Sequence, residues 1–531
     1  MSKLTTLALP LLTSLLFSTA VFSAPETELQ DQTATPEVTE ATDEAVENPT
    51  IPPSPEGYKF NKQTVVDLAR SLSKQPMQAP QKAPEALNGM DYETYRQINF
   101  QQNQAVWGNS PTKFSIQLFA PGFLYQDLIE IDAVENGRAF PIEVKPDSFT
   151  TPNDEINQLI TQVGKYAGLR LHYPINRNEY KDEFIVFQGA SYFRAVSRGQ
   201  NYGVSARGLA IDVAQPTGEE FPMFRHFWIE RPSTSQEAIV VHALLDSKRV
   251  TGAYRFGIYP GSPTRVDVEA TLFPRDDIKH VGLAPITSMY MFNGSLNHSR
   301  TEDFREAVHD SEGLQIQTGK DELLWRPLNN PENLQISAFM DQSPKGFGLI
   351  QRHRRFADYQ DLEANYQNRP SMWIKPLNDW GEGHVELVEI PSNSEANDNI
   401  VAYWQPKGGL KKGEPFTYSY RLTMTNDTPV LADKPHIVRS AQGNKLQNDN
   451  EEVVIDFNNI DITDMNTIAV DASISSGEII EAHLAPNPYQ NGVRAYVTFD
   501  PKDANSAELR VQLQQEGKPL AATWLYRWLN E

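Results

Sequence analysis

The sequence AIVVHALLDSKRVTGAYRFGIYPGSPTRVDVEATLFP, residues 238–274, decides the fold class. It holds three short apolar runs, at 238–245, 253–258 and 266–273. A polar segment separates the first two runs, and a segment with glycine and two prolines separates the last two. Short apolar runs bounded by turn-forming residues, at spacings of about ten residues, are typical of the antiparallel strands of a sandwich or barrel.

The same pattern extends in both directions along the chain. Residues 114–119 alternate between the two faces of a strand before the turn at Pro121-Gly122, and Asn136-Gly137 is a hairpin signal. Few segments keep a period of 3.6 residues, so a parallel βαβ architecture is not expected. We therefore predict a mainly β protein. Its other strands in this part of the chain are expected at 184–187, 209–213 and 385–390.

Two short helices are predicted ahead of the first strands. Asn61 is a helix N-cap candidate, and the apolar residues of 65–72 fall on one helical face before Pro76 stops the pattern. A second helix is expected within 91–98.

A domain boundary is predicted at 406–413, a Gly- and Lys-rich stretch without aromatic residues that reads as a flexible linker. It would separate a large domain, 58–405, from a smaller one, 414–531. Seven or so short strands in about 120 residues predict an immunoglobulin-like sandwich for the smaller domain. These strands are expected near 416–424, 453–457, 468–474, 494–499, 509–513 and 523–528.

The first 57 residues have a different composition. Residues 1–24 have Lys3, an apolar run and small residues before position 25, which predicts a secretory signal peptide; an uncleaved anchor is the alternative. Residues 25–57 hold nine Asp or Glu, six prolines and no Lys or Arg, which predicts a disordered acidic tether. Without this segment and Lys3, the net charge of −22 falls to −14 for the rest of the chain.

Composition excludes several classes of function. The 531 residues include no cysteine, which removes thiolate nucleophiles, iron–sulfur clusters and disulfides. The acidic balance argues against nucleic-acid binding, since few phosphate contacts would be available. The ten histidines show no metal-ligand spacing, and neither a P-loop nor a dinucleotide-binding fingerprint is present. We expect no metal and no cofactor.

One stretch is rich in aromatic residues and carboxylates. Four of the eight tryptophans, Trp325, Trp373, Trp380 and Trp404, lie within eighty residues of one another, among tyrosines, aspartates and arginines. Indole faces stack on sugar rings while carboxylates and arginines bind hydroxyl groups, so these residues predict an oligosaccharide site. The alternative is that the tryptophans fill the sandwich core, since aromatic residues dominate core packing.

Long motifs then become recognisable. FQGASYFR at 187–194 and YGVSARGLAID at 202–212 closely resemble the periplasmic glucan biosynthesis protein G/D family, closest to the G branch. The resemblance runs from about residue 60 to the C-terminus and weakens after 415. Other motifs that carry it are GEEFP at 218–222, FWIERP at 227–232, ALLDS at 243–247, APITSM at 284–289, WRPLNNP at 325–331, GFGL at 346–349 and NDNIVAYW at 397–404.

The resemblance implies a fold, an activity and a site. The first domain would be a galactose-mutarotase-like β-sandwich. The protein would take part in making osmoregulated periplasmic glucans with a β-1,2-linked backbone, and would be similar to inverting endo-β-1,2-glucanases. Asp398 matches the general acid and Asp310 the general base. Tyr366 and Arg369 match positions that approach the glucan.

Alternatives remain open at each of these points. Asp398 and Asp310 are also consistent with loop or cap residues, Tyr366 with core packing and Arg369 with a surface ion pair. The protein as a whole would be either a periplasmic glucan hydrolase or a non-catalytic scaffold that receives nascent glucan from a membrane glucosyltransferase. A mutarotase-like epimerase rests on fold analogy alone. The sequence leaves the oligomeric state open.

Overall fold

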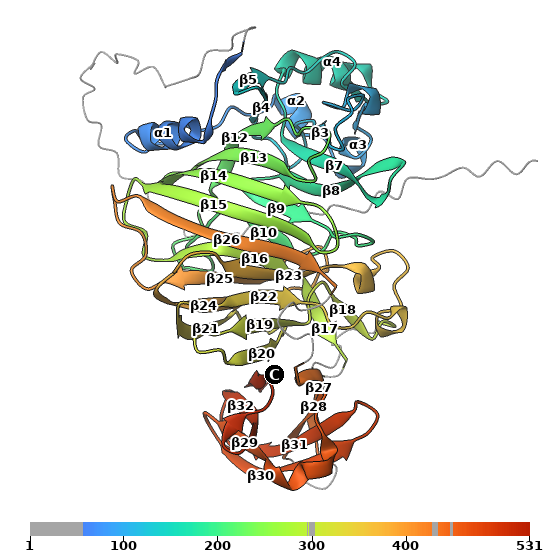
Figure 1. Ribbon diagram of the computed structural model, residues 1–531, viewed down its shortest axis with the longest axis vertical. Helices are drawn as coiled ribbons and strands as arrows, with labels where there is room; N and C mark the ends of the chain where they lie inside the picture. The colour runs from blue at the N-terminus through green and yellow to red at the C-terminus, as the bar shows by residue number, and fades with distance from the viewer. Residues whose placement is uncertain (1–56, 295, 297–302, 427–433, 446–449, 531) are drawn as a thin grey trace, which may run out of the picture.

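Two large β-sheets form most of the molecule (Figure 1). The computed structural model describes residues 57–294, 296, 303–426, 434–445 and 450–530. The prediction of a mainly β protein is confirmed. The expected signal peptide, 1–24, and all of the expected tether except residue 57 lie outside the described residues.

The larger sheet contains sixteen strands in one hydrogen-bonded array. In spatial order they are β1 (Tyr58–Lys59), β5 (Arg138–Pro141), β4 (Glu130–Glu135), β12 (Met223–Glu230), β13 (Ile239–Asp246), β14 (Val250–Tyr259), β15 (Thr264–Pro274), β26 (Phe416–Thr425), β23 (Ser371–Pro376), β22 (Gly346–Ile350), β19 (Gly313–Gln317), β20 (Leu323–Pro327), β34 (Thr523–Leu529), β32 (Ser506–Gln515) and β29 (Ile468–Ile474), with β33 (Lys518–Pro519) beside β32.

The second sheet has ten strands and covers one face of the first. Its order is β21 (Gln335–Gln342), β24 (Glu382–Glu389), β25 (Ile400–Pro406), β16 (Val281–Ser288), β10 (Ser205–Arg207), β9 (Tyr192–Ala195), β8 (Tyr180–Gln188), β7 (Gly168–Arg177) and β3 (Ser115–Phe119), with β11 (Ala210–Ile211) beside β16.

Smaller elements complete the described chain. Two two-stranded ribbons are formed by β2 (Asn99–Phe100) with β6 (Phe149–Thr150) and by β17 (Tyr290–Asn293) with β18 (Ala307–His309). A four-stranded sheet is formed by β27 (His436–Asn444), β28 (Glu451–Asn458), β31 (Gly492–Asp500) and β30 (Glu478–Asn487). The helices are α1 (Lys62–Leu72), α2 (Glu85–Asn88), α3 (Tyr92–Tyr95), α4 (Asp154–Val163) and the 3₁₀ turns η1 (Gln102–Gln104), η2 (Phe356–Asp358), η3 (Tyr366–Asn368) and η4 (Ile462–Thr467).

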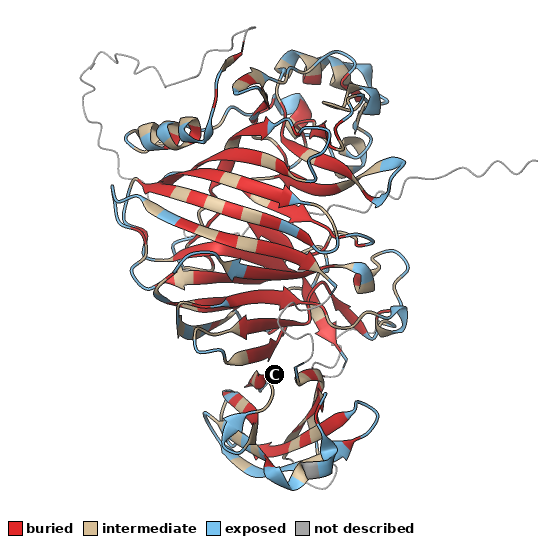
Figure 2. Cartoon of the chain, in the orientation of Figure 1, coloured by how far each residue is buried: buried red, intermediate tan, exposed pale blue. Residues whose placement is uncertain are grey.

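The stretch 238–274 forms the antiparallel strands β13, β14 and β15, as predicted. Successive side chains point to opposite faces of a strand, so each strand supplies alternate residues to two environments. Val241, Ala243 and Leu245 enter the core between the two large sheets, whereas Leu244 packs on the other face, beneath α1. In Figure 2 most residues of β13 and β14 are coloured as buried.

Helix α1 starts where the sequence predicts. The Asn61 side chain accepts a hydrogen bond from the Thr64 amide, and the Thr64 hydroxyl accepts one from the Asn61 amide, which makes a capping box. Val65 and Ala69 bury the apolar face against β13 and β14. The helix expected within 91–98 is only the four-residue α3. The Asn136-Gly137 hairpin is confirmed between β4 and β5, with φ of 52° and 73° at its two central residues.

The predicted boundary at 406–413 is wrong. Leu410 is buried and pairs with Ile278 through backbone hydrogen bonds, so this stretch is not a free linker. Strand β26, which the sequence places in the smaller domain, lies between β15 and β23 in the larger sheet. Its apolar face, with Leu422 and Met424, completes the core between the two sheets.

The smaller domain begins after β26 and is compatible with an immunoglobulin-like sandwich. The four-stranded sheet packs against β29, β32 and β34 around a second core. Strand β34 pairs in parallel with β20, so the larger sheet runs without a break from one domain into the other. Side chains of the large domain also enter the second core, among them Ile350. Among the described residues, no helix has the length and apolarity needed to cross a membrane.

Candidate active site

The second sheet carries a polar surface on the face that points away from the main core. Phe193 of β9 and Ala206 of β10 enter the core. Because side chains alternate, Arg194 and the residues on either side of Ala206, Ser205 and Arg207, lie on the opposite face. Buried arginines on a sheet face require partners, and the structure supplies carboxylates for them.

Asp398 lies on this face, in the loop between β24 and β25. Its Oδ2 accepts hydrogen bonds from the hydroxyl of Thr287 at 3.1 Å and from that of Ser205 at 3.4 Å. Arg194 Nη2 lies 3.4 Å from the same oxygen. The carboxylate is 19% exposed, so one side remains open to a ligand.

The neighbouring Asn399 fixes the position of this loop. Its Oδ1 accepts the amide of Tyr290 at 2.8 Å, and its Nδ2 donates to the carbonyl of Tyr290 at 2.9 Å and to that of Ile390 at 3.1 Å. Asp398 therefore stands beside a residue that is hydrogen-bonded on three sides, and its backbone has little freedom.

Asp310 lies directly after β18. Its amide donates to the carbonyl of Met289 at 2.8 Å, and the hydroxyl of Ser288 donates to that of Ser311 at 2.8 Å. The Asp310 carboxylate is 5% exposed and forms an ion pair with Arg369. Burial raises the pKa of Asp310, Arg369 partly offsets this increase, and the charge of Asp398 raises the pKa further.

The two aspartates, 88 positions apart in sequence, thus meet at one segment. Thr287 binds Asp398, Met289 binds the Asp310 amide, and these two anchors are two residues apart, which spans about 7 Å at most. The influence of Asp398 on the pKa of Asp310 is consistent with this proximity. The structure brings both predicted carboxylates to one site.

Tyr366 and Arg369 come from the η3 turn and complete the Asp310 side. The Arg369 guanidinium carbon lies 4.4 Å from the centre of the Tyr366 ring, and the Tyr366 hydroxyl donates to Glu395 Oε2 at 2.9 Å. Burial raises the pKa of Tyr366 above its usual value, so the phenol keeps its proton. A Cβ at Gly203 would lie 2.9 Å from the Arg369 Cβ, so only glycine permits this approach.

The four predicted tryptophans do not line this site. Trp380 and Trp404 are packed in the main core, and Trp325 and Trp373 in the second core. Each is at most 6% exposed, so little indole surface is available for stacking on a sugar ring. The expectation that these residues bind substrate is corrected here: they fill the cores. Trp373 is also among the residues that line a hollow of about 800 Å³, together with Lys375 and Arg421.

Several polar residues of the site were not predicted. Arg207 Nη1 donates to Glu219 at 2.5 Å, and its guanidinium carbon lies 4.6 Å from the ring of Tyr192. Arg194 and Thr287, which contact Asp398, belong to the same polar face. All of them belong to the motifs that carry the family resemblance, and that membership was the available signal.

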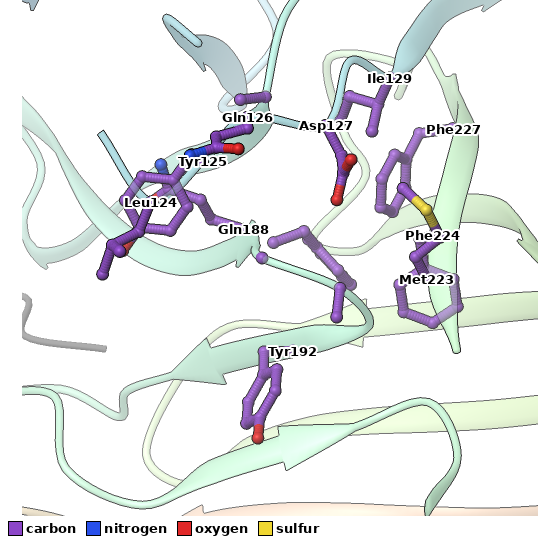
Figure 3. Close-up of a pocket in the computed structure, with 14 residues that line it drawn as sticks. Leu124, Tyr125, Gln126, Asp127, Ile129, Gln188, Tyr192, Met223, Phe224 and Phe227 are labelled. Atoms are coloured by element: carbon purple, nitrogen blue, oxygen red, sulfur yellow. The ribbon is translucent and has the colours of Figure 1, made fainter. Parts of the chain in front are cut away.

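Tyr192 also borders a small cavity (Figure 3). The cavity measures about 60 Å³, which suits a few water molecules and not a sugar ring. Its wall combines the phenol of Tyr125 and the amide of Gln188 with the apolar side chains of Met223 and Phe224. Within the described part of the chain, no three His, Asp or Glu side chains are grouped as metal ligands.

Fold and site together define a class of mainly β proteins with a carboxylate- and arginine-rich sheet face. Comparison with known sequences identifies the group within this class. The profile of the family described as "Periplasmic glucan biosynthesis protein, MdoG" matches residues 60–528. The chain belongs to this periplasmic family, which confirms the resemblance and supports a role in glucan biosynthesis.

Similar proteins agree with the family assignment. The chain is 62% identical over 472 residues to glucans biosynthesis protein G 2 of Shewanella oneidensis, with 89% of each chain covered. It is 47% identical to glucans biosynthesis protein G of Vibrio cholerae strain N16961, over 88% of this chain and 87% of that protein. Among solved structures, the GH36 α-galactosidase AgaA of Geobacillus stearothermophilus aligns with a TM-score of 0.25 at 8% identity, over 49% of this chain and 39% of that one, which is too weak to inform the fold.

Proposed function

We propose that this protein is an inverting endo-β-1,2-glucanase that trims glucan in the periplasm, after export directed by residues 1–24. The observation that carries the proposal is the meeting of Asp398 and Asp310 at the segment 287–290, on a polar sheet face. Pairs of carboxylates are the usual machinery of glycoside hydrolysis. The family's role in glucan biosynthesis supplies the class of substrate.

The reaction divides the two carboxyl groups into an acid and a base. Protonated Asp398 gives its proton to the glycosidic oxygen as the bond from that oxygen to the anomeric carbon breaks. A water molecule attacks the anomeric carbon from the opposite face and transfers a proton toward Asp310. Exchange of protons with solvent then restores both groups, and the product has the inverted configuration.

The surroundings of Asp310 suit a base. Its pKa is raised mainly by burial, and a carboxylate with a raised pKa takes up a proton more readily than an ordinary one. Arg369 holds the carboxylate in place, and Tyr366 is stacked on Arg369. Tyr366 is buried with its hydroxyl on Glu395, whereas the Arg369 side chain is 21% exposed. The guanidinium of Arg369 can therefore also orient water or a glucan hydroxyl.

A second candidate function is a glucan-binding scaffold that takes nascent chains from a membrane glucosyltransferase. One observation favours it: the Asp310 carboxylate is 5% exposed and already bound to Arg369, so water reaches it only through neighbouring groups. In this version the polar sheet face would hold glucan without cleaving it.

The test is incubation of purified protein with linear β-1,2-glucan. We expect short oligosaccharides from the wild type, at least about 100-fold fewer from Asp398→Asn and Asp310→Asn, and NMR detection of the α-anomer as the first product. Asp276→Asn is the matched control, because its side chain is 66% exposed in a surface pair with Lys412. Binding without cleavage by the wild type would favour the scaffold, and equal cleavage by all variants would exclude both aspartates as catalytic groups.

A further inference from the structure

A single arginine joins three segments around the Asp310 side of the site. Arg305 Nη1 lies 2.8 Å from Asp361 Oδ2 and 2.8 Å from Glu395 Oε2. Its Nε and Nη2 bind the two oxygens of Asp303, at 3.0 Å and 2.7 Å for the shorter contacts. The side chain is 16% exposed. One guanidinium therefore connects the chain before β18, the turn before η3 and the loop that leads to Asp398.

The contact with Asp361 affects the turn that carries Tyr366 and Arg369. Asp361 Oδ1 accepts the amides of Glu363 at 2.9 Å and Ala364 at 2.7 Å, while Oδ2 receives Arg305. The carbonyl of Ala364 in turn accepts Arg369 Nε at 3.4 Å. Arg305 thus holds the carboxylate that shapes the start of this turn.

The contact with Glu395 affects the phenol directly. Glu395 Oε2 accepts both Arg305 Nη1 and the Tyr366 hydroxyl, at 2.8 Å and 2.9 Å. The Tyr366 ring lies against Arg369, which pairs with Asp310. A continuous series of contacts therefore runs from Arg305 to the Asp310 carboxylate.

The charges make this arrangement depend on Arg305. Asp303, Asp361 and Glu395 gather around one cation, and without it three carboxylates would repel one another in a partly buried place. Hydrogen bonds from Arg305 lower the pKa of Asp303. A lysine would keep the charge, but it lacks the planar fork that binds several carboxylates at fixed angles.

We propose that Arg305 is a positioning residue, which holds Glu395 and the turn 361–364 so that Tyr366 and Arg369 stay aligned on Asp310. The kinetic part of this inference rests on the proposed hydrolase function. The positional part does not, because it concerns only how firmly Arg305 holds Glu395 and the turn 361–364 in place.

Two measurements test it on the full chain, with Arg305→Lys and Arg305→Met. Hydrogen–deuterium exchange at the amides of 363 and 364 should become at least about tenfold faster in Arg305→Met, with a smaller change in Arg305→Lys. With linear β-1,2-glucan, kcat should fall at least about tenfold in Arg305→Met while KM changes little, with partial recovery in Arg305→Lys. Arg355→Gln is the control, since its side chain is 81% exposed and pairs with Asp358, three residues further along the chain.

A double-mutant cycle with Tyr366→Phe separates positioning from general stability. If Arg305 acts through Tyr366, Arg305→Met should lower kcat far less in the Tyr366→Phe background than in the wild type. Unchanged exchange at 363 and 364 would overturn the inference, as would fully additive effects on kcat. Faster exchange in Arg305→Met, combined with a wild-type protein that does not cleave glucan, would refute the proposed hydrolase and leave the positional role standing.

Discussion

The hydroxyl of Thr287, near the end of strand β16, donates a 3.1 Å hydrogen bond to Asp398 Oδ2, and Met289, just beyond that strand, anchors the amide of Asp310. This contact links the placement of the acid to the placement of the base. The end of β16 therefore sets the geometry between the two carboxylates, and changes there should alter chemistry more than folding.

Replacing Thr287 with valine tests this relationship. Valine keeps the shape and removes the hydroxyl, so kcat on linear β-1,2-glucan should fall about tenfold, with about 1 kcal/mol lost from the free energy of unfolding. Thr417→Val is the control, because the Thr417 hydroxyl faces solvent beside Thr271. An unchanged kcat in Thr287→Val would mean that the contact does not position Asp398 for catalysis.

The pH dependence of activity should report Asp310. The base acts when it is ionised, and its pKa is raised above the ordinary 3.8 by burial. Lowering the pH protonates Asp310 and removes activity, so the acid limb of kcat/KM should lie above pH 3.8. A profile of initial rates from pH 3 to 8 measures this limb. Full activity maintained below pH 3.8 would contradict the role of Asp310 as base.

Glu386 should govern part of the acid stability. Burial alone would raise its pKa, but hydrogen bonds from His280, His384 and Tyr403 lower it from 4.5 to about 2. The folded state thus holds the proton less tightly than the unfolded state. The ionised group stabilises the fold above pH 4.5, and this contribution is lost as the pH falls from 4.5 to about 2.

Denaturant unfolding at several pH values checks this expectation. Glu386→Gln should be less stable than the wild type at pH 7, and the difference should shrink as the pH falls through this window. Glu382→Gln, on the same strand with a 56% exposed side chain paired to Lys407, serves as the control. A difference that stays constant from pH 7 to 2 would refute the assignment.

The burial of Trp404 predicts a structural effect without a binding effect. Trp404→Phe leaves a gap in the main core and should cost about 1–2 kcal/mol of unfolding free energy. The affinity of the folded protein for β-1,2-glucan should stay within about twofold, since the side chain lies between the sheets. Calorimetric titration measures the affinity, and a large loss of binding would restore Trp404 to the site.

Local signals predicted the local structure well. The Asn136-Gly137 hairpin, the Asn61 cap and the apolar runs of 238–274 depend on neighbouring residues, and the structure confirms them. The position of β26 depends on pairing with β15 and β23, which are about 150 and 50 residues earlier in the chain, and no local pattern records such pairing. The glycines of 406–413 therefore suggested a linker where the chain packs closely.

The candidate site likewise has a part that the sequence predicts and a part that only the fold reveals. Motifs identify Asp398, Asp310, Tyr366 and Arg369, and only the fold shows that Thr287 and Arg194 contact Asp398. The tryptophans were misassigned because composition does not tell which side of a strand faces the core. Arg194 and Arg207 lie on the short strands β9 and β10, which no local sequence pattern predicts, so their common sheet face becomes visible only in the structure.

The parallel pairing of β20 with β34 has a mechanical consequence. Rotating the smaller domain would break backbone hydrogen bonds along this pair and pull Trp325 and Trp373 out of the shared core. These contacts therefore hold the smaller domain in a fixed orientation relative to the large domain and its polar sheet face. A molecule that binds the smaller domain therefore also determines the orientation of the polar sheet face.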